Sequence, residues 1–181
     1  NYTLYDRIKA AGITDEETIK NMAVLANSLV FTSQGISFML SGEEFLRTKG
    51  GNSNSYNASY QVNELDYSLK IKNMDVFNNY QKLIALKQNA NLFARSKEEC
   101  KNITINKNND GSLIYFDLID NENKLQYRFA YSNGYKSKAS KNVDFNGFTL
   151  YLDTLNKEDL VLSSDSVLDE LEVIIAYKSI E

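Results

Sequence analysis

The hydrophobic residues of this 181-residue chain change their spacing near Cys100, and this change most restricts the possible folds. Before it, apolar residues recur at the three- and four-residue intervals of amphipathic helices. After it, apolar and polar residues alternate in short runs, and the clearest run contains Leu125, Tyr127, Phe129 and Tyr131. Such alternation is typical of strands with one buried face. We therefore expect α/β structure first and an antiparallel β-sandwich after it.

Two helices are predicted in the first half. Thr14 and Glu17 have the spacing of a capping box, with Thr14 as the N-cap, and apolar residues then follow at helical spacing over 15–33. Gln34 and Gly35 end this helix, because glycine suits the left-handed position after a helix. A second helix is predicted to begin near Asp75.

Between these helices lies a short apolar run, "ISFML", at residues 36–40. It shows no alternation, which predicts a strand buried on both faces, as in parallel sheets. A polar loop from about Glu43 to Asn73 follows it. In β/α units the ligand-binding loops leave the carboxyl ends of strands, and loops of this length are usually functional or disordered.

The second half contains four aromatic and β-branched runs, at 112–119, 124–131, 148–154 and 170–178. We predict a strand in each, with a hairpin turn at Asn146 and Gly147. We place the boundary between the parts near residue 95, which gives domains 1–95 and 96–181.

The composition excludes several kinds of site. The chain contains no His, no Pro and no Trp, so it cannot supply a histidine base or a histidine metal ligand. A net charge of -4 argues against nucleic acid as a partner, and no apolar run reaches the length of a membrane span. The first residues lack the pattern of a signal peptide. Cys100 is interpreted as a small hydrophobic residue, and no metal or cofactor is expected.

Adjacent carboxylates at Glu43 and Glu44 suggest the acid/base pair of a glycosidase. On a strand, however, neighbouring side chains point to opposite faces, so the two could not converge on one bond. We therefore expect a structural role for this pair.

The loop after these carboxylates carries groups suited to a sugar. Amide side chains can both donate to and accept from vicinal hydroxyls, and tyrosine rings can cover the apolar faces of a pyranose. The candidates are Arg47, Asn52, Asn54, Ser55, Tyr56, Asn57 and Asn63. The alternative is that Asn, Gly and Ser occur here because they tolerate turn conformations.

The order of these residues supports the first interpretation. The segment "GISFMLSGEEFLRTKGGNSNSYNASYQVNELDYSLK" resembles the last barrel strand and following loop of type I pullulanases, in the α-amylase superfamily of glycoside hydrolases. The opening "NYTLYDRI" and the tail "LDELEVIIAYKS" resemble further segments of that family. The chain departs from the family pattern at Ser37, Ser53 and Tyr67, where the family has Pro, His and commonly Trp. These are the residue types that the composition lacks.

The resemblance implies the C-terminal portion of such an enzyme: the last helix–strand–helix part of a (β/α)₈ barrel in 1–95, and a C-terminal antiparallel β-sandwich in 96–181. It implies a debranching hydrolase that cleaves α-1,6-glucosidic bonds in starch, glycogen or pullulan. The catalytic acids of the family lie upstream of this portion, so the segment alone is expected to be inactive. Its implied partners are α-glucan and the rest of the barrel. The expected substrate-binding residues are Asn1, Arg47, Ser53, Asn54, Tyr56 and Asn63. The alternative function is a non-catalytic carbohydrate-binding or scaffold module.

Overall fold

The computed structural model describes residues 2–181, so Asn1 lies outside the described residues. The helices are α1 (Leu4–Ala10), α2 (Glu16–Thr32), the 3₁₀ turn η1 (Glu43–Phe45), α3 (Tyr60–Asn63), α4 (Ser68–Lys72), α5 (Met74–Lys87), α6 (Ala90–Phe93) and α7 (Lys97–Cys100). The strands are β1 (Asn106–Lys107), β2 (Leu113–Asp120), β3 (Leu125–Ser132), β4 (Asn142–Val143), β5 (Thr149–Asp153), β6 (Ser166–Val167) and β7 (Val173–Ser179). No helix among residues 2–181 has both the length and the apolar character needed to cross a membrane.

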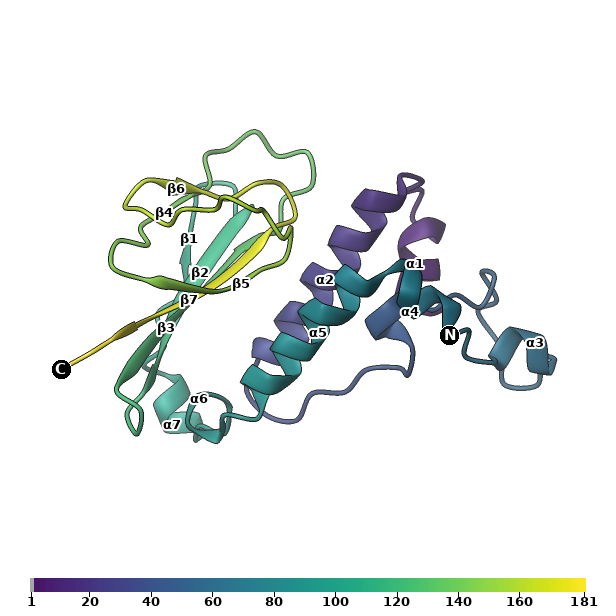
Figure 1. Cartoon of the computed structure of the whole chain (residues 1–181), viewed down its shortest axis with the longest axis horizontal. Coiled ribbons are helices and arrows are strands. Elements are labelled where there is room, and N and C mark those ends of the chain that lie inside the picture. The colour runs from purple at the N-terminus through teal and green to yellow at the C-terminus, as the bar shows by residue number, and fades with distance from the viewer. Residues whose placement is uncertain (1) are drawn as a thin grey trace.

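Helices α2 and α5 lie side by side in the middle of the molecule (Figure 1). The sheet lies on one side of them, and the loops around α3 project on the other, so the C-terminus and the α3 region occupy opposite ends of the long axis. The two predicted helices are therefore present. They form a layer between the sheet and the polar loop.

The N-cap of α2 corrects a detail of the prediction. Asp15, and not Thr14, caps the helix: its carboxylate accepts hydrogen bonds from the Thr18 backbone N–H at 2.8 Å and from the Thr18 hydroxyl at 2.6 Å. The predicted capping box between Thr14 and Glu17 is wrong. Aspartate is at least as good an N-cap as threonine, so the helix begins one residue later than the pattern indicated.

The predicted buried strand at residues 36–40 is wrong. This segment forms neither helix nor strand, it pairs with no strand among the described residues, and Ile36 and Phe38 are 101% and 88% exposed. A strand needs a neighbour to satisfy its backbone groups, and no strand of the described chain lies beside it. Met39 packs against the core, and the Ser37 hydroxyl donates to the Val30 carbonyl at 3.0 Å.

The four strands predicted in the second half are present as β2, β3, β5 and β7. The main sheet has the order β1-β2-β3-β7-β5, and all its pairs are antiparallel. Its register aligns Phe116 with Phe129 and Phe129 with Ile175 across three strands. A second sheet consists of β4 and β6. The antiparallel part of the predicted fold is thus observed.

The predicted hairpin at Asn146 and Gly147 is wrong, although a tight turn exists there. The Phe148 N–H donates to the Phe145 carbonyl at 2.9 Å, and Gly147 has φ +77°. Asn146 is not in the positive-φ region that a type I′ hairpin turn requires at both central residues. The flanking strands therefore separate, and β4 joins β6 while β5 joins β7.

The main sheet has a hydrophobic core on each face. Toward the helices, Phe129, Tyr131 and Ile175 join one buried cluster with residues of α2 and α5 such as Val24 and Leu83. On the opposite face a second cluster forms under β4, β6 and the long loops, from Leu113, Ala130, Val143, Phe145, Leu168, Ile174 and Ala176. The helices and the sheet thus share buried surface, and the far layer has a separate core.

Candidate functional site

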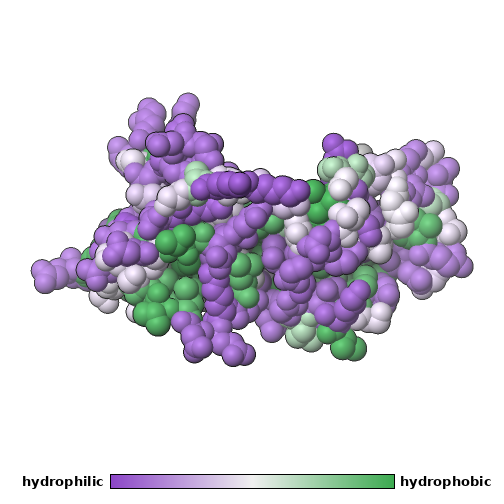
Figure 2. All heavy atoms as spheres, turned by 90° about the horizontal axis from the view of Figure 1, so that it is seen from above, coloured by the Kyte–Doolittle hydropathy of each residue, from purple (hydrophilic) through white to green (hydrophobic). Residues whose placement is uncertain are grey.

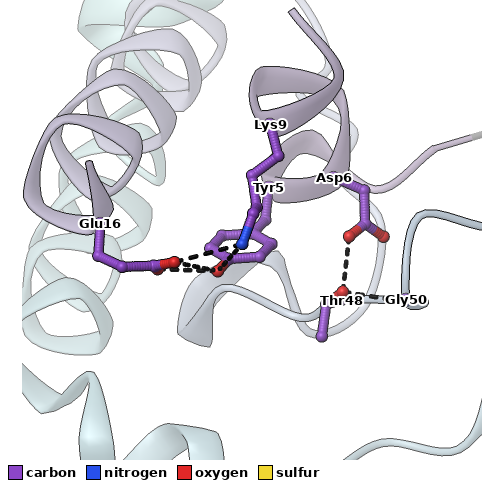
Figure 3. A network of polar contacts seen from close by, with 6 residues as sticks. All are labelled: Tyr5, Asp6, Lys9, Glu16, Thr48 and Gly50. Atoms are coloured by element: carbon purple, nitrogen blue, oxygen red, sulfur yellow. Dashed lines mark hydrogen bonds and ion pairs between the residues drawn. The ribbon is translucent and has the colours of Figure 1, made fainter. Parts of the chain in front are cut away.

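Asp6 of helix α1 anchors the start of the polar loop (Figure 3). Its side chain is 5% exposed and accepts hydrogen bonds from the Thr48 hydroxyl at 2.6 Å, the Lys49 backbone N–H at 2.7 Å and the Thr3 hydroxyl at 2.9 Å. Burial alone would raise the pKa of Asp6, but these hydrogen bonds outweigh it and hold the pKa below its ordinary value. Asp6 is therefore an ionised acceptor that ties the loop to α1.

The turn before this loop depends on Gly42. Its φ is +95°, and a Cβ at this position would lie 2.8 Å from Arg47 Cβ, so only glycine fits without a clash. The Glu44 carboxylate accepts the Gly42 N–H at 2.9 Å, and the Arg47 N–H donates to the Gly42 carbonyl at 2.9 Å. Glu43 and Glu44 therefore belong to a 3₁₀ turn and not to a strand, which corrects the geometry assumed from the sequence.

Arg47 connects this turn to helix α3. Its side chain is buried and donates to the backbone carbonyls of Ser41, at 3.1 Å, and Asn63. The Asn63 amide in turn donates to the Ser55 carbonyl at 2.7 Å. These contacts fix the two ends of the loop relative to each other.

A cavity of about 420 Å³ opens where these segments meet. Its lining combines rings, amides, a hydroxyl, one cation and one carboxylate: Tyr2, Leu40, Glu43, Lys49, Asn54, Ser55, Tyr56 and Asn63. The Tyr56 ring is 84% exposed, and the Lys49 ammonium donates to the Ser55 hydroxyl at 2.7 Å. This mixture of apolar faces with donors and acceptors suits a small polyhydroxylated ligand.

The residues expected to bind substrate fall into distinct positions. Asn54, Tyr56 and Asn63 line the cavity together. Arg47 and Ser53 do not line it: Arg47 is buried behind the loop, and Ser53 is exposed. Asn1 lies outside the described residues.

Sequence reasoning missed Tyr2, Leu40 and Lys49 as lining residues and assigned Glu43 a structural role only. These residues come from three segments that are separated along the chain. The only sequence signal for Lys49 was its place directly after Arg47 and Thr48 in the segment that resembles the family.

A second polar network lies on the other side of α1 (Figure 3). The Tyr5 hydroxyl donates to the Glu16 carboxylate at 2.8 Å, and the Lys9 ammonium lies 3.3 Å from the same carboxylate. Burial, with the Glu16 contact, raises the pKa of Tyr5, and the Tyr5 hydrogen bond lowers the pKa of Glu16. The network borders a separate cavity of about 360 Å³. Within the described part of the chain, no three His, Cys, Asp or Glu side chains cluster as they would around a metal ion.

Part of the chain is similar in sequence to curated pullulanases. No protein-family model matches the chain. Among curated relatives, the pullulanase of Bacillus subtilis (strain 168) is 32% identical over 89 residues, which are 49% of this chain and 12% of that protein. The pullulanase of Klebsiella aerogenes is 38% identical over 78 residues, which are 42% of this chain and 7% of that protein. The chain thus matches only a small part of the length of each curated relative.

Solved structures show similarity over nearly the whole chain. A pullulanase from Bacillus acidopullulyticus has a TM-score of 0.83 and 30% identity, covering 98% of this chain and 23% of that one. A pullulanase from Anoxybacillus sp. LM18-11, complexed with maltotetraose, has a TM-score of 0.85 and 24% identity, covering 98% of this chain and 26% of that one. Along nearly its whole length, the chain is therefore similar in fold to one segment of these pullulanases, while the sequence similarity to the two curated relatives covers less than half of it.

Proposed function

We propose that the chain is the C-terminal segment of a glycoside hydrolase that cleaves the α-1,6 bonds of branched α-glucans such as pullulan. The observation that carries this proposal is the cavity formed by Asn54, Tyr56 and Asn63 within the loop that resembles the pullulanase motif. Similar proteins have been solved with maltotetraose and maltotriose, which supports a glucan as the ligand.

In this proposal, Asn54 and Tyr56 contact the glucan directly. An exposed ring can stack on the apolar face of a pyranose, and an amide can bond two adjacent hydroxyls. Arg47 lies behind the loop and Asn63 lines the cavity, and the hydrogen bonds of both side chains hold the loop in place. Ser53 does not line the cavity, so it contributes only where a longer glucan extends beyond it.

The rest of the catalytic barrel is the proposed partner of residues 36–40. Two large apolar residues, Ile36 and Phe38, are fully or almost fully exposed, and the segment pairs with no strand among the described residues. Strands contributed by another part of the protein would bury both side chains and satisfy the free backbone groups. This proposal makes residues 1–95 part of a (β/α)₈ barrel and 96–181 a C-terminal β-sandwich domain.

We expect the 181-residue chain to bind glucan without hydrolysing it. Glu44 is engaged by the Gly42 N–H, so it does not pair with Glu43 in the cavity. A glycosidase needs two carboxyl groups that flank one bond. Reducing-sugar release from pullulan that disappears on Glu43→Gln substitution would contradict this expectation.

Titration of the chain with maltotetraose tests the function. The double variant Asn54→Ala/Tyr56→Ala is expected to weaken binding by about 5- to 150-fold, since each of the two lost contacts is worth about 0.5–1.5 kcal/mol. The matched control is Asn78→Ala/Tyr135→Ala, which removes an amide and a ring outside the cavity. If the two double variants bind maltotetraose with equal affinity, the loop does not bind the glucan and its role is structural.

A non-catalytic carbohydrate-binding module is the second candidate, because Glu43 is the one carboxylate among the described residues that line the cavity, and a binding module needs no second one. Both functions predict maltotetraose binding. They differ in the full reading frame: a debranching enzyme must encode the catalytic Asp and Glu on the missing barrel strands upstream.

A further inference from the structure

The two neighbouring carboxylates, Glu43 and Glu44, have different surroundings. Glu44 turns back onto its own loop and accepts the Gly42 N–H at 2.9 Å. Glu43 lines the cavity of about 420 Å³, and it also lines an adjoining cavity of about 390 Å³ next to Tyr2 and Arg7. One carboxylate of the pair is therefore structural, and the other faces space that a ligand can occupy.

The Glu43 carboxylate is supported from behind by two buried side chains of the helices. The Asn27 amide nitrogen of α2 donates to the Tyr80 hydroxyl of α5 at 2.6 Å and lies 3.4 Å from Glu43 Oε2. Asn27 is 5% exposed and Tyr80 is 1% exposed, and burial raises the pKa of Tyr80, so it remains a neutral phenol. The amide uses its two protons on these two acceptors. This arrangement orients Glu43 Oε2, while Oε1 has no hydrogen bond to any described residue.

Lys49 provides the complementary group in the same cavity. Its ammonium donates one hydrogen bond to Ser55, which leaves further protons for a ligand. No ion pair within 4 Å joins Lys49 and Glu43 among the described residues, so they do not neutralise each other. The cavity thus offers an acceptor-only group and a donor-only group at separate positions.

We infer that Glu43 is a specificity-determining residue, whose carboxylate accepts hydrogen bonds from the hydroxyls of a neutral saccharide, with Lys49 donating to an adjacent oxygen. Sugar hydroxyls can donate to a carboxylate, whereas a ligand group that only accepts cannot. Such charge-assisted bonds are stronger than those between neutral partners. The inference rests on the proposed glucan function and deepens it by naming the residue that accepts hydrogen bonds from the sugar hydroxyls.

Maltotetraose titrations of wild type, Glu43→Gln and Glu44→Gln test this inference. Glu43→Gln keeps the size of the side chain and removes its charge, and it is expected to weaken binding about tenfold. The matched control Glu44→Gln should bind within about twofold of wild type, provided that its circular dichroism spectrum is native.

The outcomes separate the inference from the proposed function. If wild type does not bind maltotetraose, the proposed function fails and the inference fails with it. If wild type binds and Glu43→Gln matches Glu44→Gln in affinity, the inference is overturned and the function stands. If Glu43→Gln does not fold, the inference is tested on wild type instead. Nuclear magnetic resonance then compares the side-chain carboxyl carbon signals of Glu43 and Glu44 with and without maltotetraose. A ligand-induced shift at Glu43 but not at Glu44 supports the inference, and no shift at Glu43 overturns it.

Discussion

At the scale of single residues, Asp6 is expected to control the order of the loop around the cavity. Replacing it with Asn keeps its size but turns one acceptor oxygen into a donor that faces the Lys49 N–H or the Thr48 hydroxyl. We expect Asp6→Asn to lower the free energy of unfolding by about 1–3 kcal/mol and to weaken maltotetraose binding. Urea unfolding and titration would measure both. The exposed Asp159→Asn is the control, and equal behaviour of the two variants would contradict the role of Asp6.

Glu172 is expected to make stability depend on pH. It is 0% exposed, lies 2.7 Å from the Lys157 ammonium and accepts the Asp169 N–H at 2.6 Å. Burial raises the pKa of Glu172 to about 7, with a further contribution from Asp153 and in spite of the opposing effect of Lys157.

The native state therefore keeps a proton on Glu172 that the unfolded chain releases near its ordinary pKa of 4.5. The free energy of unfolding should fall as the pH rises from about 4.5 to about 7, by at most about 3 kcal/mol. The raised pKa of Lys157 acts only in alkaline solution, outside this window. Urea unfolding at several pH values should show this slope in wild type and in the exposed control Glu158→Gln. An unchanged slope in Glu172→Gln would contradict the assignment.

At the scale of elements, the η1 turn should tolerate no side chain at position 42. Gly42→Ala combines a positive φ with a clash against Arg47 Cβ and Cδ, both at 2.8 Å. Gly111→Ala is the matched control, because Gly111 has φ +73° and nothing within 4 Å of the added Cβ. The positive φ should lower the free energy of unfolding of both variants by about 1 kcal/mol. The clash should lower that of Gly42→Ala by at least about 1 kcal/mol more. Thermal unfolding of the two variants measures the difference, and equal losses would show that Arg47 moves freely.

The elements also show what local pattern can and cannot predict. The β2 and β3 strands were predictable because their aromatic and β-branched runs favour strands, and because their pairing partners lie within this chain. Residues 36–40 were not, because strand pairing depends on neighbours that sequence distance does not reveal. The same limit applies to the cavity. Turn-forming residues and the family resemblance pointed to Asn54 and Tyr56, but Tyr2 and Glu43 reach it only through the packing of other segments.

At the scale of the whole molecule, the helices and the main sheet are joined by polar contacts as well as by the shared cluster. The Asn79 amide of α5 donates to the Thr154 carbonyl at 3.0 Å, and the Tyr151 hydroxyl donates to the Lys82 carbonyl at 3.0 Å. The Thr32 and Tyr131 hydroxyls share a buried hydrogen bond. The division at residue 95 remains a proposal about domain organisation. Whether these parts also unfold separately is a different question, which hydrogen exchange can answer.

We predict that residues 2–181 unfold as one cooperative unit. Leu83 of α5 is 1% exposed and belongs to the same cluster as Phe129 and Ile175, so Leu83→Ala should cost about 2–5 kcal/mol. In a single unit, amide protection in β7, which is paired on both sides, falls by the same free energy, because its most protected amides exchange through global unfolding. The control is Ile84→Ala, which truncates the adjacent, 37% exposed side chain. If Leu83→Ala lowered protection in α5 but left that of β7 at the wild-type value, the helices would unfold independently of the sheet.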